Sequence, residues 1–444
     1  MVGDGGGLID WAGNWSAAAV AVAVAVVVVV VVVNAANAAN AANSTATLSY
    51  TRESYYPVEQ GEIMNGRYQV ISKIGYGSSS TVWLARDFVE STYVALKVFT
   101  LNQRTGNEVS VYNHIQSTGT DHPGQKDIRK LLDHFFLQGP NGRRACLVHE
   151  LFGMSVLELD TIGHNLGVID PAPRLDQAKP LIRRVLYALD YLHRAAEVIH
   201  TGNVSTSLTP MRNLLFPAAS QARMSRYEEN MIKNPPSRKI LQDRTIYATR
   251  LFPTEDGLPV LCEFGEARFG DKHNCGMIMP DLHRIPGVIL VFPSWDYKVD
   301  SWGVGMLAWD CISTRPLISN HRRDDHWDDG AHVAELVALL GHPPREFTRR
   351  GTHGHIFWDE NGSWTDLVTI PDRSLEQAAA DIEGEDPEDF LPWLRRALQW
   401  DPKDRPTIWD LFMDPWLMKG MRARRDDQAL KDYPDIVEVV EIID

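Results

Sequence analysis

Gly75, Gly77 and Lys97 are the residues whose types and spacing first suggest a chemistry. They lie in a segment that reads Ile-Gly-Tyr-Gly-Ser-Ser-Ser-Thr-Val-Trp-Leu-Ala-Arg from Ile74 and, after a short turn, ends in Tyr-Val-Ala-Leu-Lys. Because glycine has no Cβ atom, it can turn tightly and let a ligand approach its backbone. A lysine ammonium group binds phosphate oxygens as a point charge. The segment could therefore cover a polyphosphate, with the lysine reaching its oxygens.

Apolar and polar residues alternate on both sides of the glycines, which is typical of strands. The alternating positions are Val70, Ser72, Ile74, Val82, Leu84, Val94, Leu96 and Val98. The pattern predicts a strand, a glycine turn, a second strand and a third strand that carries the lysine. Taken alone, an ordinary hairpin turn and a solvated lysine at a strand end would explain this segment about as well.

The composition limits the classes of protein to which the chain can belong. Its 444 residues suffice for one large bilobal domain or two ordinary ones with tails. A net charge of -14 argues against a general affinity for nucleic acid or anionic membranes, so no direct nucleic-acid binding is expected. The cysteines, Cys146, Cys262, Cys275 and Cys311, form no Cys-x-x-Cys pair. We expect no disulfide framework or zinc site, and a reducing compartment, the cytoplasm or the nucleus.

Residues 1–54 differ in composition from the rest of the chain. Ala17 to Val33 is an uninterrupted alanine and valine run, and Asn-Ala-Ala repeats follow it. We interpret residues 1–54 as a low-complexity, disordered segment. The alternative is a membrane anchor in the alanine and valine run, which is near the lower length limit for a span. The last residues, 421–444, are predicted to form a charged tail.

A helix is predicted after the third strand. Val109, Tyr112 and Ile115 recur at spacings of three, and Glu108 lies beside them. Glu108 is the only acidic residue between Lys97 and Asp121. It could pair with Lys97, although an exposed helix glutamate is the commoner case.

Two more strands and a long helix follow along the chain. The strands are predicted at 128–136 and 145–149, with His149 at the end of the second. The backbone from Glu150 to Gly153 could then bind an adenine ring. Leu175 to Ala195 reads as an amphipathic helix, which leads into a short buried strand ending at His200.

A series of segments, in one order along residues 55–420, matches a known family. They are Asn65-Gly66-Arg67-Tyr68, Gly75-Tyr76-Gly77, Val94-Ala95-Leu96-Lys97, His200-Thr201, Pro236-Ser237-Arg238-Lys239-Ile240, Asp243-Arg244-Thr245-Ile246-Tyr247, Phe264-Gly265-Glu266-Ala267-Arg268-Phe269-Gly270, Pro280-Asp281-Leu282, His332 to Gly341 and Gln399-Trp400-Asp401-Pro402. In these segments the chain resembles the serine/arginine-protein kinase (SRPK) family, in particular its fungal members. The resemblance implies an α+β, bilobal protein kinase fold. A small five-stranded β lobe with one helix would span 55–152, and a large, mainly α lobe with a spacer insert at 220–259 would span 153–420.

The resemblance also implies an activity: ATP- and Mg²⁺-dependent phosphorylation of serines in Arg/Ser-rich proteins that regulate mRNA splicing. The nucleotide contacts it implies are Ile74, Gly75, Gly77, Val82, Ala95, Lys97, Glu108, Glu150 and Phe152, and the metal ligands are Glu263 and Asn213. Acidic clusters at 324–329 and 381–389 could dock basic peptides, or they could simply be solvated loops. A monomer is expected.

The chain departs from the family where the catalytic loop should be. The family has an aspartate after His-Thr, which accepts the proton of the substrate hydroxyl, but Gly202 stands there in this chain. Asn213 follows His200 at a larger distance than the kinase motif has. Part of the segment from Gly202 to Arg212 therefore looks inserted, either by divergence or because non-coding sequence was read through.

Two other motifs also differ from the family. Glu263 replaces the aspartate of Asp-Phe-Gly, so the longer side chain should weaken a magnesium site without necessarily abolishing it. Gly287 replaces the glutamate of Ala-Pro-Glu, which should pair with a buried Arg405, so either another acidic residue substitutes or the large lobe is loosened. Two functions stay open: an active kinase of this family, and a pseudokinase that binds nucleotide or a partner without transferring phosphate.

Overall fold

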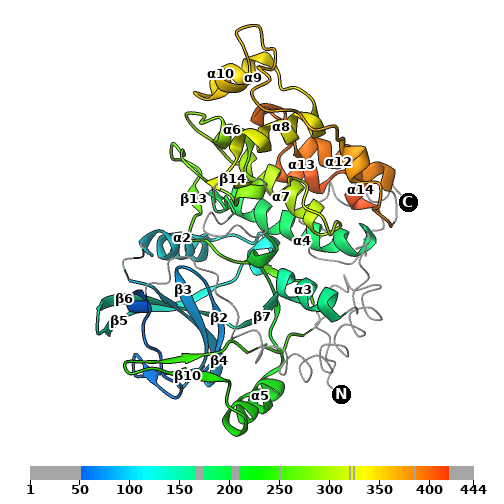
Figure 1. Ribbon diagram of the computed structural model, residues 1–444. Coiled ribbons are helices and arrows are strands. Elements are labelled where there is room, and N and C mark those ends of the chain that lie inside the picture. Colours follow the sequence, from blue (N-terminus) through cyan, green and yellow to red (C-terminus); the bar gives the residue numbers. More distant parts are fainter. Residues whose placement is uncertain are drawn as a thin grey trace, which may run out of the picture.

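The computed structural model describes residues 52–419, except positions 102, 104, 167–174, 203–209, 251, 256, 320–321, 324–325 and 385–386. The run from Ala17 to Val33, the tail at 421–444, most of the segment that looks inserted and parts of both acidic clusters lie outside these residues. The chain forms two lobes, a sheet-rich small lobe and a helix-rich large lobe (Figure 1). Within the described ranges, no helix is long and apolar enough to cross a membrane.

The small lobe is built on an antiparallel sheet of six strands. Their order is β1 (Ile63–Met64), β2 (Tyr68–Tyr76), β3 (Ser80–Asp87), β4 (Thr92–Phe99), β6 (Gly142–Glu150) and β5 (Leu131–Gly139). The predicted strands are present, but the expected number of five was wrong. The sixth strand, β1, is two residues long and pairs only with β2, so its short sequence carries no visible alternation.

Both faces of the sheet are covered, which explains why β4 is buried almost throughout. On one face, Val94, Leu96 and Val98 pack in a core with Trp83. On the other face lies the only α-helix between residues 55 and 152 in the described chain, α2 (Gly106–Ser117). Its buried side chains are Glu108, Val111, Tyr112 and Ile115, whereas the predicted Val109 is only half-buried.

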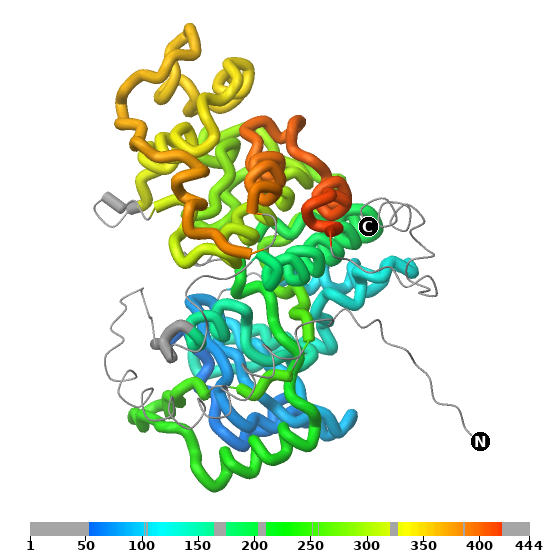
Figure 2. Tube along the Cα trace, turned by 90° about the vertical axis from the view of Figure 1, so that its right-hand side faces the viewer, coloured from blue at the N-terminus to red at the C-terminus, as the bar shows by residue number. Residues whose placement is uncertain are grey.

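The spacer packs against the small lobe, although its ends leave from the large lobe. It contains α5 (Gln221–Lys233), β10 (Arg238–Ile240) and β11 (Thr245–Tyr247). Tyr247 meets the Trp83 ring edge-on at 5.7 Å, and Met224 and Met231 pack on Leu84. Figures 1 and 2 both show this green segment beside the blue strands, at the end of the molecule away from the large lobe.

The large lobe holds the remaining elements. Its α-helices are α3 (Val156–Leu166), α4 (Leu175–Arg194), α6 (Pro286–Ile289), α7 (Lys298–Asp310), α8 (Asp329–Leu340), α9 (Arg345–Arg350), α10 (Gly354–Phe357), α11 (Leu375–Ala378), α12 (Pro387–Ala397), α13 (Ile408–Phe412) and α14 (Pro415–Met418). Its strands are β7 (Phe152–Ser155), β8 (Val198–Ile199), β9 (Leu214–Pro217), β12 (Val260–Leu261), β13 (Arg268–Phe269), β14 (Arg322–Arg323) and β15 (His326–Trp327). The short 3-10 helices η3 (Pro210–Asn213), η4 (Asp281–His283) and η5 (Pro402–Asp404) also belong to this lobe, whereas η1 (Arg52–Ser54) and η2 (Pro123–Asp127) come earlier in the chain, before β1 and before β5. The predicted amphipathic helix is α4, which packs against α7 in the lobe's core.

Arg405 is buried in the large lobe, as expected, but carbonyl oxygens take the place of the acidic partner. Its guanidinium donates hydrogen bonds to the carbonyls of Gln399 at 2.7 Å, Trp400 at 2.8 Å and Lys298 at 3.4 Å. It also lies over the Trp302 ring, 5.3 Å from the centroid. Burial lowers the pKa of Arg405 to about 9, so the group stays charged at neutral pH. The loss of the family's glutamate is thus compensated by backbone acceptors.

Candidate active site

Lys97 lies between two carboxylates that come from different lobes. Its Nζ atom is 2.9 Å from Oε1 of Glu108 on α2 and 3.1 Å from Oε2 of Glu263, which follows β12. The predicted pairing of Lys97 with Glu108 is therefore present. Glu263 was expected as a metal ligand, but its contact with Lys97 was not foreseen, and this contact ties the central strand of the small lobe to the large lobe.

Lys97, Glu108 and Glu263 shift one another's pKa values. Burial alone would lower the pKa of Lys97, but the two carboxylates outweigh it and raise that pKa above its usual range. Lys97 in turn holds the pKa of Glu263 below its ordinary value. Burial raises the pKa of Glu108, with Lys97 opposing that rise. At neutral pH the site therefore holds an ammonium group and an ionised Glu263, which can bind phosphate oxygens and a hard cation respectively.

A column of rings connects α2 to the loop after β8. Tyr112 and Phe264 meet with centroids 5.1 Å apart, and Phe264 and His200 meet at 5.2 Å. Phe264 is fully buried between them. Because Tyr112 lies one helical turn from Glu108 on α2, this column fixes the helix that carries Glu108 relative to His200.

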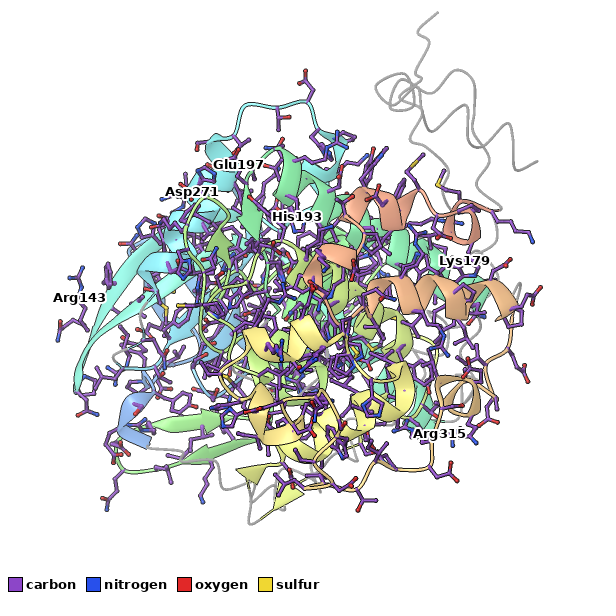
Figure 3. All side chains as sticks on the ribbon, turned by 90° about the horizontal axis from the view of Figure 1, so that it is seen from above. Arg143, Lys179, His193, Glu197, Asp271 and Arg315 are labelled. Atoms are coloured by element: carbon purple, nitrogen blue, oxygen red, sulfur yellow. The ribbon has the colours of Figure 1, made fainter. Side chains whose placement is uncertain are left out.

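Asp300, on the first turn of α7, holds the backbone of the loop that contains His200. Its carboxylate accepts hydrogen bonds from the backbone N–H groups of His200 and Thr201, each at 2.8 Å. His193 on α4, labelled in Figure 3, contacts the same carboxylate through Nε2 at 2.8 Å. Burial tends to raise the pKa of Asp300, but these hydrogen bonds lower it overall. The side chain supports the loop and does not cap its own helix.

Gly202 follows this loop in a left-handed conformation, with φ 62°. Its position carries no carboxylate, so the group that would accept the substrate's proton is missing there. Beyond the undescribed residues 203–209, the chain returns at η3 and Asn213. The carbonyl of Asn213 accepts a hydrogen bond from the backbone N–H of Cys262 at 2.8 Å. Pairing of β9 with β12 thus brings Asn213 beside the segment of Glu263, although the spacer separates them in sequence.

The glycine segment forms the end of β2 and the turn into β3. Gly75 lies inside β2, opposite Val82, and the Gly77 N–H donates to the carbonyl of Ser80 at 2.8 Å. Gly75 therefore lies in the strand and not in the predicted turn, and neither glycine has a positive φ. A Cβ atom at Gly77 would meet nothing within 4 Å, which leaves open space beside its backbone.

The remaining predicted nucleotide contacts come from β2, β3, β4 and the connection to the large lobe. Ile74 and Val82 are half-buried, and Ala95 is buried opposite His149 of β6. Glu150 ends β6 and Phe152 begins β7.

Arg129 is a residue of this site that the sequence did not suggest. It is buried just before β5, and its Nε and Nη2 atoms donate to the carbonyl oxygen of Glu150 at 3.1 and 3.0 Å. The only feature of the nearby sequence that could have indicated this role is a positively charged residue directly after the apolar Ile128.

Comparisons with known proteins agree with this geometry. No protein-family model matches the chain. A serine/threonine protein kinase of Aspergillus fumigatus is 35% identical over 377 residues, which cover 83% of this chain and 89% of that protein. A serine/threonine-protein kinase SRPK of Physarum polycephalum is 26% identical over 402 residues, 84% of this chain and 90% of that protein. SRSF protein kinase 3 of Mus musculus is 35% identical over 156 residues, 34% of this chain and 27% of that protein. The chain therefore belongs to the serine/threonine protein kinases of the SRPK type.

Proposed function

We propose that this chain binds ATP with Mg²⁺ between its lobes and transfers the terminal phosphoryl group to serines of Arg/Ser-rich proteins. The observation that carries the proposal is the position of the Lys97 ammonium, 2.9 Å from Glu108 and 3.1 Å from Glu263. Phosphoryl transfer depends mainly on positioning and electrostatics, and the geometry of these three groups supports a role in it. The substrate class is supported by the family resemblance and by the name of the mouse relative, an SRSF protein kinase.

Each predicted contact has a role in this proposal. Gly75 and Gly77 would cover the phosphates, Lys97 would bind their oxygens, and backbone groups of Glu150 and Phe152 would meet the base. The apolar side chains around the ring would be Ile74, Val82 and Ala95. The fold that supports these roles is the bilobal protein kinase fold.

The residues present fit Mg²⁺ in part. Mg²⁺ usually keeps several waters and takes one or two carboxylates plus substrate phosphates. Glu263 offers an ionised carboxylate, since its pKa is lowered by Lys97, and the neighbouring Asn213 would be the second ligand. No group of three or more metal-ligating side chains occurs in the part of the chain that the structure describes. When bound, the ion would neutralise charge on the phosphates.

The glycine at position 202 sets the expected rate. A general base contributes about 10²- to 10⁴-fold to such a reaction, and the remaining groups act by binding and orientation. We therefore propose a slow kinase whose ammonium group, ring column and Asp300-supported loop are in place. The substrate hydroxyl would lose its proton to water.

A pseudokinase is the second candidate, because Gly202 removes the base and the sequence has no aspartate between Asp190 and Asp243. The test is transfer of labelled phosphate from ATP with Mg²⁺ to an arginine–serine repeat peptide by the full chain. Transfer above that of a Lys97→Met control supports the kinase. Transfer equal to the control, with a nucleotide-induced rise in melting temperature, favours the pseudokinase. If neither occurs, the nucleotide site itself is refuted.

The proposed partners, oligomeric state and compartment follow from the acidic net charge of the chain and from its resemblance to the SRPK family. Basic docking peptides would bind acidic surface loops, and the chain would act as a monomer in the cytoplasm or the nucleus. Size measurement by light scattering tests the monomer.

A further inference from the structure

Arg129 binds the backbone carbonyl that begins the connection between the lobes. Two atoms of its guanidinium, Nε and Nη2, donate to the Glu150 oxygen at 3.1 and 3.0 Å. Only 8% of Arg129 is exposed. Among the described residues, no carboxylate forms an ion pair with it within 4 Å. The Glu150 carbonyl is therefore a main acceptor for a buried cation.

The position of Arg129 places this cation at the same site as Lys97. Its backbone N–H donates to the carbonyl of Leu261 at 3.0 Å, two residues before Glu263. Burial raises the pKa of Glu108 and the charge of Arg129 opposes that rise, whereas Lys97 lowers the pKa of Glu263 with a smaller contribution from Arg129. Arg129 also helps burial to lower the pKa of His149, which precedes Glu150. Arg129 thus links the segment before Glu263 to the hinge carbonyl of Glu150.

This contact changes what the hinge offers to a nucleobase. A carbonyl oxygen has two lone pairs, and two N–H donors of one guanidinium already occupy them. An amino group on the base would be a third donor at this oxygen, next to a positive charge. A carbonyl group on the base would instead accept from the guanidinium, which has five N–H donors and uses two of them here.

We infer that Arg129 sets the base preference of this site, so that purine triphosphates with a carbonyl at C6 bind at least as tightly as ATP. This inference rests on the proposed nucleotide binding and adds the residue that selects the base. Adenine carries an amino group at C6, whereas hypoxanthine and guanine carry an oxygen. Leaving a buried polar group unpaired weakens binding, which is the physical source of the discrimination.

The test compares ATP with inosine triphosphate (ITP), which carries a carbonyl at C6 and a proton on N1. Dissociation constants of the two magnesium complexes are measured by calorimetry on the full chain. For the unmodified chain, ITP should bind as tightly as ATP or more tightly. Arg129→Leu frees the Glu150 carbonyl and should shift the ratio of the two constants toward ATP by roughly tenfold.

A matched control is Arg143→Leu. Arg143 is an exposed arginine at the outer edge of the small lobe, where it lies over the Phe136 ring (Figure 3). It should leave the ratio unchanged. Because both nucleotides are measured on each variant, a general loss of affinity cancels in the ratio. If Arg129→Leu fails to fold, the ITP/ATP ratio of Arg129→Met and the base preference of the unmodified chain still test the inference.

The outcomes separate this inference from the proposed function. Clear preference for ATP by the unmodified chain, or a ratio that Arg129→Leu does not change, overturns the inference and leaves nucleotide binding intact. If neither nucleotide binds to the unmodified chain or to Arg143→Leu, the proposed function and the inference both fail.

Discussion

Nζ of Lys97 and Oε2 of Glu263 lie 3.1 Å apart, in a contact that joins β4 of the small lobe to the segment after β12 of the large lobe. A glutamate is longer than the aspartate that the family has at this position. Its carboxylate can therefore reach the lysine that also pairs with Glu108. The replacement seen in the sequence thus has a structural consequence: the lysine is shared between the lobes.

Lys97→Met should remove nucleotide binding and destabilise the fold. The change deletes the ammonium group and leaves Glu108 buried without its cation. Breaking a buried pair of this kind costs about 3–5 kcal/mol, less whatever protonation of the carboxylates recovers. Urea unfolding measures the stability, and the melting temperature with and without ATP and Mg²⁺ measures binding. The control Lys239→Met removes an exposed lysine of β10 and should affect neither. A nucleotide-induced shift that survives Lys97→Met would contradict the assignment.

Glu263→Asp should lower the concentration of Mg²⁺ needed for nucleotide binding. The shorter carboxylate withdraws from Lys97 and becomes freer to meet the strict octahedral geometry of Mg²⁺. Glu263→Gln, which has nearly the same shape without the charge, should raise the Mg²⁺ requirement. Titration of Mg²⁺ at fixed ATP, followed by calorimetry, gives both values. Equal requirements in all three proteins would mean that this side chain is not a metal ligand.

Gly202→Asp should increase phosphate transfer to an arginine–serine peptide. It restores a carboxylate next to the loop held by Asp300, and a general base is worth about 10²- to 10⁴-fold. A Cβ atom at Gly202 would meet Met279 and Pro280 at 3.9 Å, an ordinary contact. The left-handed φ of 62° costs about 1–2 kcal/mol for a residue with a side chain, less for Asp or Asn.

Gly202→Asn is the matched control for this change, because it has the same shape and the same backbone strain but no basic carboxylate. Initial rates with labelled ATP compare the three proteins. A gain seen equally with the asparagine variant would assign the effect to the backbone and not to a base.

The strands and the Lys97–Glu108 pair could be predicted because their signals are local. The alternation of apolar and polar residues predicts the strands β2 to β4. Glu108 could be chosen as the partner of Lys97 because no other acidic residue lies nearby in the sequence. The helix face was placed less well, since Val111 is buried and Val109 only half-buried. Here the packing of α2 on the sheet decides the face, which a short run of apolar residues cannot define.

Contacts between distant segments could not be predicted. Arg129 donates to Glu150, and Arg405 donates to three carbonyls, through backbone acceptors that no residue type reveals. The spacer likewise reaches both faces of the sheet, since Tyr247 packs on Trp83 on the face away from α2, whereas Met224 and Met231 pack with Leu84 on the face that carries Ala95. In these cases the contact depends on how distant segments pack together, and no sequence motif records that packing.

Lys73→Met should stabilise the chain at neutral pH, and the gain should shrink as the pH rises. Burial lowers the pKa of Lys73 from 10.5 to about 8. Between these two values the unfolded chain binds a proton that the folded chain has lost, so the stability of the unmodified protein rises with pH. The advantage of the variant is therefore largest below about pH 8 and vanishes near pH 10.5. Urea unfolding of both proteins across this range measures it. An advantage that is constant with pH would show that Lys73 titrates normally.

Tyr247 tests whether the spacer is part of the small-lobe core. Its ring packs edge-on against Trp83, and its hydroxyl group donates to Glu59 at 2.6 Å. Tyr247→Ala removes a buried ring and should cost about 3–5 kcal/mol of unfolding free energy. Tyr247→Phe keeps the ring and should cost only about 1 kcal/mol, the worth of a hydrogen bond. If the alanine variant unfolds at the same urea concentration as the unmodified chain, the spacer does not stabilise the sheet. If the alanine variant unfolds earlier while the phenylalanine variant does not, the spacer is an integral layer of the lobe that carries Lys97.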